Sequence, residues 1–83
     1  IEQNYEVLAR QEELHELGFP LLIGVSRKRL IWQTLGTSAR EALNGTTAVN
    51  IMALERGGDI LRVHDVREAA EAITIYKQLK NIL

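Results

Sequence analysis

The 83-residue chain contains no cysteine, which excludes disulfide bridges, thiolate catalysis and zinc sites built on cysteine. Aromatic residues make up only 5% of the chain, and it has a single proline. Neither sign of charge dominates, because ten lysine and arginine residues stand against eleven aspartate and glutamate residues, for a formal net charge of −1. General nucleic-acid binders and anionic-membrane binders are strongly basic, so we expect neither a nucleic-acid partner nor a membrane partner.

Long apolar runs and a secretory leader pattern are lacking as well. No apolar run approaches the ~20 residues that a membrane-spanning helix needs, and the first residues do not resemble a signal peptide. We therefore expect a cytoplasmic protein. The first residue is Ile1 rather than methionine, so we also expect a longer natural chain. The remaining composition, 46% hydrophobic and 25% charged, is typical of a globular protein.

Periodicity and glycine positions predict an alternation of helices and strands. Residues 1–17 predict one helix, which Gly18 closes and Pro20 prevents from continuing. Residues 21–25 form a short continuous apolar run, and residues 59–63 form a second short strand. Runs of this kind are typical of strands that are buried on both faces, as in parallel sheets covered by helices.

Helices are expected around and between the strands. Residues 29–35 predict a short helix, and residues 37–45 predict a loop with Gly45 as its break. A further helix is expected from about Thr46 to Arg56.

The last helix is expected to follow Asp65, with Glu68 as the partner in a capping box. The resulting order is helix, strand, helix, helix, strand, helix, which predicts an α/β fold with parallel strands and right-handed crossovers. A sheet of only two such strands leaves backbone N–H and C=O groups unpaired on both of its edges. We therefore interpret residues 1–83 as consecutive βα units of a larger α/β protein.

Basic side chains follow both predicted strands. The run Ser-Arg-Lys-Arg at residues 26–29 comes after the first strand, and Arg62 and His64 project to one side at the end of the second. Ligands of such sheets bind at the carboxyl ends of the strands, so we expect Lys28, Arg62 and His64 to converge there. Three such groups beside two predicted helix starts suit a phosphate or diphosphate. The alternative is that the basic run is only a solvated loop.

Two strings of residues carry a resemblance to a known family. Residues 20–29, Pro-Leu-Leu-Ile-Gly-Val-Ser-Arg-Lys-Arg, and residues 57–66, Gly-Gly-Asp-Ile-Leu-Arg-Val-His-Asp-Val, resemble the C-terminal part of the dihydropteroate synthases. Residues 44–48 are similar to that family's small-residue helix start. Residues 1–10 are similar to the helix after its glycine-rich sixth-strand loop. The resemblance covers nearly the whole chain.

The resemblance implies the C-terminal βα units, about the last quarter to third, of a (β/α)8 TIM barrel. These units would contain two parallel strands with flanking helices. It implies a transferase of folate biosynthesis, which condenses 6-hydroxymethyl-7,8-dihydropterin diphosphate with para-aminobenzoate to 7,8-dihydropteroate and diphosphate. It also implies Mg²⁺, bound through an asparagine that would precede Ile1, and a homodimer.

The same resemblance implies roles for individual side chains. The residues expected to bind substrate are Ser26, Lys28, Arg29, Arg62, Val63 and His64. Lys28 would recognise the pterin ring, Arg62 would lie against that ring and reach the diphosphate, and His64 would bind the diphosphate. Arg29 would border the para-aminobenzoate pocket, at a position that is often serine in the family. No residue of the chain is expected to bind a metal or to act as a catalytic acid or base.

Other interpretations of the same residues stay open. The basic cluster could belong to a phosphate-binding module of a different barrel enzyme, or the chain could be a non-catalytic, self-associating piece. A nucleic-acid-binding helix led by residues 27–29 is disfavoured by the net charge of −1. Because most of the family's substrate-binding and metal-binding residues would precede Ile1, we expect the chain alone to be inactive.

Overall fold

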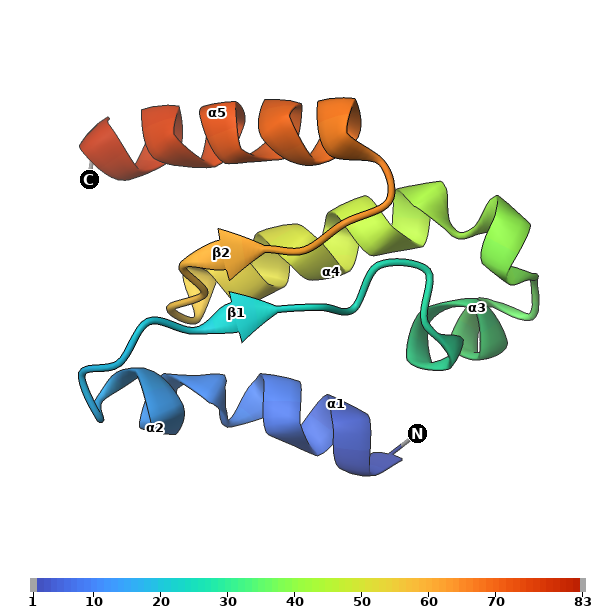
Figure 1. The fold of residues 1–83 in the computed structure, drawn as a ribbon, viewed down its shortest axis with the longest axis horizontal. Coiled ribbons are helices and arrows are strands. Elements are labelled where there is room, and N and C mark those ends of the chain that lie inside the picture. Colours follow the sequence, from blue (N-terminus) through green and yellow to red (C-terminus); the bar gives the residue numbers. More distant parts are fainter. Residues whose placement is uncertain (1, 83) are drawn as a thin grey trace.

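The computed structural model of the chain describes residues 2–82, so Ile1, expected within the first helix, and Leu83 lie outside the described residues. Helices and short strands alternate along the chain (Figure 1). In chain order these elements are α1 (Glu2–Ala9), α2 (Gln11–His15), β1 (Leu22–Ile23), α3 (Arg29–Leu35), the 3-10 turn η1 (Ala39–Glu41), α4 (Leu43–Glu55), β2 (Ile60–Leu61) and α5 (Val66–Ile82).

The two strands lie side by side and pair in parallel, with Leu22 opposite Ile60 and Ile23 opposite Leu61 (Figure 1). The pairing continues past β2, where the N–H of Arg62 donates to the carbonyl of Ile23 at 2.8 Å. The strands are shorter than the predicted ranges. They run in parallel, and α3 and α4 lie between them along the chain, which confirms the predicted architecture.

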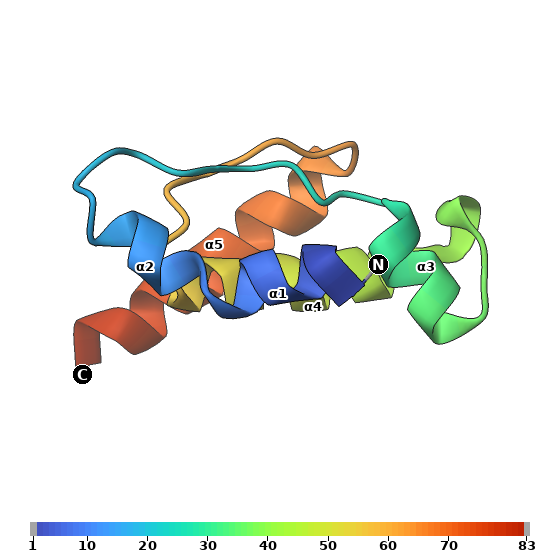
Figure 2. The same cartoon turned by 90° about the horizontal axis from the view of Figure 1, so that it is seen from below.

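Helices cover only one face of the two-stranded sheet. Figure 2 shows α1, α4 and α5 on the same side of the strands. The side chain of Ile23 faces these helices and is 8% exposed, whereas Leu22 and Ile60 are 55% and 52% exposed. The prediction that the strands are buried on both faces is therefore wrong for this chain, because no described element covers the second face.

The core lies between α3, α4 and α1. Leu30, Ile31 and Ala42 form its buried centre, and Tyr5 packs against it while its hydroxyl donates to the Leu30 carbonyl at 2.6 Å. Gly45 is buried inside α4, and a Cβ placed on it would lie 2.5 Å from Cγ2 of Ile31. The predicted break at Gly45 is thus wrong: this glycine sits in the first turns of α4 and lets α3 approach closely.

The first helical segment also differs from its prediction. It breaks at Arg10, whose backbone has φ −102° and ψ 13°, and α2 ends at His15. The side chain of Gln11 is buried and donates from Nε2 to the carbonyl of Ala53 at 3.0 Å, near the end of α4. This contact connects α2 to α4, and composition alone does not reveal it. Gly18 has φ 84°, the left-handed conformation expected of a helix-closing glycine. Within residues 2–82, no helix has the length and apolarity needed to cross a membrane.

Candidate functional site at the carboxyl ends of the strands

A pocket of about 140 Å³ lies where β1 and β2 end. Its walls are Gly24, Ser26, Lys28, Arg62, Val63 and His64. All the residues predicted to bind substrate line it except Arg29, which is exposed as the first residue of α3. The expected convergence of Lys28, Arg62 and His64 is therefore present in the structure, and it arises because the two strands run in the same direction.

Arg62 lies directly over Gly24. A Cβ built on Gly24 would be 2.6 Å from Nη2 and 3.1 Å from Nε of Arg62. A glycine at this position is what allows the guanidinium to approach the backbone of the neighbouring strand. The sequence predicts Gly24 only as part of the first strand. The available signal of a further role is its position two residues before Ser26, which places both residues on the same side of an extended backbone.

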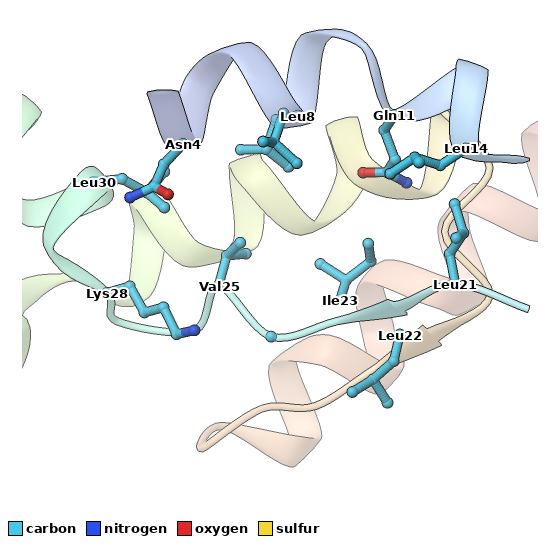
Figure 3. Close-up of a pocket in the computed structure, with 12 residues that line it drawn as sticks. Asn4, Leu8, Gln11, Leu14, Leu21, Leu22, Ile23, Val25, Lys28 and Leu30 are labelled. Atoms are coloured by element: carbon cyan, nitrogen blue, oxygen red, sulfur yellow. The ribbon is translucent and has the colours of Figure 1, made fainter. Parts of the chain in front are cut away.

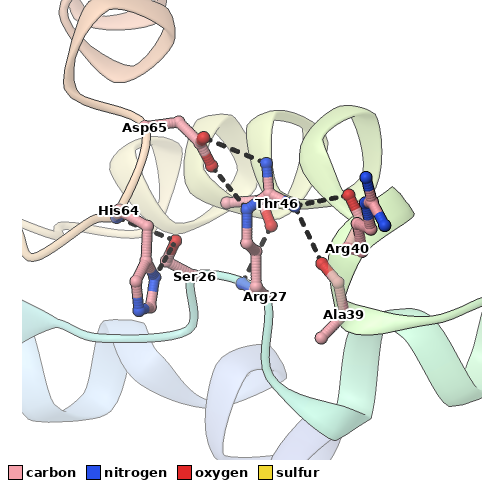
Figure 4. Close-up of polar contacts among 7 residues, drawn as sticks. All are labelled: Ser26, Arg27, Ala39, Arg40, Thr46, His64 and Asp65. Carbon is pink, nitrogen blue, oxygen red and sulfur yellow. Dashed lines mark hydrogen bonds and ion pairs between the residues drawn. The ribbon is translucent and has the colours of Figure 1, made fainter.

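Ser26 orients His64 from the facing loop. The buried Oγ of Ser26 accepts a hydrogen bond from the backbone N–H of His64 at 3.2 Å and lies 2.9 Å from its ring Nδ1 (Figure 4). In a neutral imidazole, a Ser26 hydroxyl that donates to Nδ1 leaves the ring proton on Nε2. The Nε2–H group is then a donor that suits a phosphate oxygen.

Arg27, which was not among the predicted binding residues, forms an ion pair with Asp65. Its Nε and Nη2 donate to the two carboxylate oxygens at 2.8 and 3.0 Å, and the side chains are 22% and 21% exposed (Figure 4). This bidentate contact lowers the pKa of Asp65 and raises that of Arg27. The predicted capping box is wrong, because the Asp65 carboxylate binds Arg27 and makes no hydrogen bond to the N–H groups of α5.

A second cavity, of about 330 Å³, runs along the other edge of β1 beside α1 and α2 (Figure 3). In Figure 3, Ile23 and Val25 point toward α1, and Leu22 points the opposite way. Lys28 at one end supplies the charged group among otherwise mostly apolar walls. An apolar trough beside a strand edge suits an apolar chain segment better than a polyanion. The smaller pocket is thus the better candidate for anion binding.

Comparison with known proteins decides the family. The family described as pterin binding enzyme matches residues 1–64. The chain belongs to the pterin-binding enzyme family. The dihydropteroate synthase of Escherichia coli K12 is 43% identical over 75 residues, which are 90% of this chain and 27% of that protein. The dihydropteroate synthase of Streptococcus pyogenes serotype M3 is 40% identical over 81 residues, or 95% of this chain and 30% of that protein.

Solved structures of the family agree with this membership. Yersinia pestis dihydropteroate synthase with a pterine–sulfa conjugate superimposes with a TM-score of 0.92 at 38% identity, over 96% of this chain and 32% of that one. The Clostridium difficile enzyme, solved in the presence of pteroic acid, gives 0.89 at 42% identity, over 94% and 30% of the two chains. The pterin-binding fold is therefore confirmed as two parallel βα units of a barrel. The chain spans about 30% of the length of its curated relatives.

Proposed function

We propose that the chain contributes the pterin diphosphate site of a dihydropteroate synthase. The observation that carries this proposal is the meeting of Lys28, Arg62 and His64 around one pocket at the carboxyl ends of β1 and β2. Two of these side chains are cationic at neutral pH, and the third presents a ring N–H. The resemblance assigns the same three residues to the pterin and its diphosphate. Family membership supports pterin as the ligand class.

Each side chain has a role that its chemistry allows. The guanidinium of Arg62 is planar, so it can stack on a pterin ring and donate hydrogen bonds from its edge to diphosphate oxygens. Lys28 supplies a mobile point charge with three donors, suited to the polar edge of the ring. His64, held by Ser26, donates from Nε2 to the diphosphate. Val63 forms an apolar part of the wall.

The proposed reaction is a substitution at the pterin methylene carbon. The amine nitrogen of para-aminobenzoate forms the new C–N bond, the C–O bond to diphosphate breaks, and its electron pair leaves with the diphosphate. The amine then loses one proton to solvent. Negative charge grows on the leaving oxygen, where fixed cations stabilise it without reorganisation. Arg62 and His64 are the groups of this chain placed to do so, and the N-terminus of α5 lies just after them.

Other parts of the implied site lie outside what this chain supplies. Among residues 2–82, no group of three or more His, Asp or Glu side chains could hold a metal ion. The Mg²⁺ that the resemblance implies would take its protein ligand from another part of a complete enzyme, and no step above passes through it. Arg29, outside the pocket, is proposed to border the para-aminobenzoate site.

A ligand titration of the 83-residue chain tests the proposal. We expect inorganic diphosphate to bind by isothermal titration calorimetry, and a pterin diphosphate analogue to bind more tightly because the ring adds contacts with Lys28 and Arg62. A phosphate-binding module of another barrel enzyme would bind diphosphate and gain nothing from the pterin. Equal affinity for the two ligands would therefore favour that second function, which the three basic groups also allow.

The isolated chain is expected to form no dihydropteroate in an assay with both substrates, because it holds only part of the site. A chimera in which residues 1–83 replace the matching region of the Escherichia coli enzyme should be active. Turnover by the isolated chain would contradict the first expectation, and a folded but inactive chimera that still binds the pterin would contradict the proposed reaction.

The uncovered face of the sheet predicts how the isolated chain behaves. In a closed barrel the inward face of each strand is packed, yet Leu22 and Ile60 are more than half exposed here. We propose that this face belongs inside a larger barrel, and that the chain alone self-associates to cover it. Light scattering at micromolar concentration should give a mass above the 9.4 kDa of the monomer. A stable monomer would argue against this.

A further inference from the structure

Two successive residues of the loop after β1 cross-link two successive residues of the loop after β2. The Ser26 hydroxyl forms hydrogen bonds with the backbone N–H and the ring of His64, and Arg27 forms its bidentate ion pair with Asp65 (Figure 4). These contacts join positions 38 residues apart. The same two loops carry Lys28 and His64, so the cross-links set how far apart these two pocket groups lie.

The guanidinium of Arg27 makes its hydrogen bonds away from the pocket. Besides the two bonds to Asp65, its Nη1 donates to the carbonyls of Ala39 and Arg40 at 2.8 and 2.7 Å, at the turn η1. Arg27 is also not a wall of the pocket, although residues on both sides of it are. An arginine committed to four acceptors in the protein is a poor direct ligand for a diphosphate, so its contribution must act through its neighbours.

The backbone of Arg27 points to the same conclusion. It has φ 53°, a left-handed conformation that is uncommon for a residue other than glycine. Its N–H donates to Oγ1 of Thr46, a buried side chain of α4, at 3.0 Å. A strained conformation persists when its surroundings over-determine it. Here contacts from three other segments hold the residue that separates Ser26 from Lys28.

We propose that Arg27 and Asp65 are a positioning pair, which fixes the loop after β1 against the loop after β2 so that Lys28 and His64 face the same bound diphosphate. The proposal rests on the proposed function and adds two residues to it. Neither residue touches the ligand. A planar, bidentate contact is needed for this task, because it fixes an orientation as well as a distance.

The test measures inorganic diphosphate affinity by calorimetry and the ring ¹⁵N signals of His64 by NMR in the full chain. Arg27→Gln and Asp65→Asn should each weaken diphosphate binding roughly 10- to 100-fold, the scale of losing about one charge-assisted hydrogen bond to the diphosphate, and both should shift the His64 ring signals. Arg27→Lys retains the positive charge but cannot make the planar, bidentate contact with Asp65, so it should restore only part of the diphosphate affinity. It also provides a folded variant if Arg27→Gln fails to fold.

A matched control comes from a second bidentate pair. Arg10 contacts Glu13 through Nε and Nη2 at 3.2 and 3.0 Å, on the exposed surface of α1 and α2. Arg10→Gln therefore removes a similar contact, and it should leave the diphosphate affinity and the His64 signals unchanged. A double variant separates positioning from general stability: in a His64→Ala background, Arg27→Gln should cost much less affinity than in the parent chain.

Two results would overturn the positioning role. One is an Arg27→Gln chain with unaltered His64 signals and unaltered diphosphate affinity; the other is an affinity loss as large in the His64→Ala background as in the parent. The proposed function fails differently, through a parent chain that binds diphosphate but gains nothing from the pterin. The positioning test uses no pterin, so the two failures can be told apart.

Discussion

Replacing Gly24 by alanine should displace Arg62 without removing any charge from the site. The new Cβ would lie 2.6 Å from Nη2 of Arg62, about 0.8 Å short of the 3.4 Å at which ordinary van der Waals contact begins. The group it meets is the far end of a flexible side chain, which can move into the solvent-exposed part of the pocket. The substitution therefore acts on the position of the guanidinium rather than on the packing of the core.

The magnitudes follow from these contacts. A charge-assisted hydrogen bond contributes about 1.5–3 kcal/mol, so losing one from Arg62 to a bound diphosphate should weaken binding roughly 10- to 100-fold. Stability should change little, by about 0.5 kcal/mol or less, since Gly24 has no left-handed backbone that alanine would strain. The expected pattern is a large loss of affinity with a nearly unchanged Tm.

Calorimetric titration with diphosphate and thermal unfolding by circular dichroism measure the two quantities. Gly58→Ala is the matched control, because its Cβ would meet the backbone carbonyl oxygen of Ala53 at 3.0 Å and Cγ1 of Ile23 at 2.9 Å. Gly58 lies before β2 and is not a pocket wall. This variant should lose about 1–3 kcal/mol of stability through overpacking and retain its diphosphate affinity where it is folded.

The reasoning would be refuted by a Gly24→Ala chain that binds diphosphate as tightly as the parent. It would also be refuted by a Gly24→Ala chain whose Tm falls as far as that of Gly58→Ala, because Gly24 would then have a packing role. If the Gly58→Ala chain is fully folded and still loses diphosphate affinity, the pocket responds to any disturbance of the strands.

Three further predictions concern stability. Ile31→Ala should lower the free energy of unfolding by about 2–5 kcal/mol in urea titrations, because Ile31 is 2% exposed at the centre of the core; a loss under 1 kcal/mol would contradict that placement. Tyr5→Phe should cost about 0.5–1.5 kcal/mol, through the lost bond to the Leu30 carbonyl, and an unchanged urea midpoint would argue against that bond. Arg27 holds the pKa of Asp65 below its ordinary value of 3.8, so this stabilisation is fully present above pH 3.8 and is lost as the pH falls through the depressed pKa. The Tm difference between the chain and Asp65→Asn should therefore shrink below about pH 3.8, and a constant difference would refute the assignment.

Local signals in the sequence were reliable where the structure they predict is local. The helix over residues 29–35 is found with the predicted bounds, and Gly36 closes it with φ 69°. Gly45 shows where the same logic fails, because a glycine can mark a break or a close approach between helices. Only the contact with Ile31 in the folded chain distinguishes the two. The break at Arg10 likewise could not be predicted from local signals, because the hydrogen bond from Gln11 to the Ala53 carbonyl joins residues 42 positions apart.

The candidate site was predictable to the extent that it follows from strand direction. Once β1 and β2 are parallel, Lys28, Arg62 and His64 must share the edge where the strands end. The roles of Gly24, Ser26 and Arg27 could not be derived in this way. Each depends on which side chain of the other loop lies opposite it, and that depends on the two-residue register of the sheet.

The amino-acid sequence alone determined the alternation of helices and strands, the parallel direction of the strands and the three basic groups at their ends. The alternation and the basic groups follow from local propensity and periodicity, which each segment carries by itself, and the parallel direction follows from the alternation. Only the tertiary structure decided that one face of the sheet is uncovered, that Asp65 binds Arg27 rather than capping α5, and that Gly24 makes room for Arg62. The physical reason is distance along the chain: such contacts join residues nearly 40 positions apart, and neither partner specifies the other until the chain has folded.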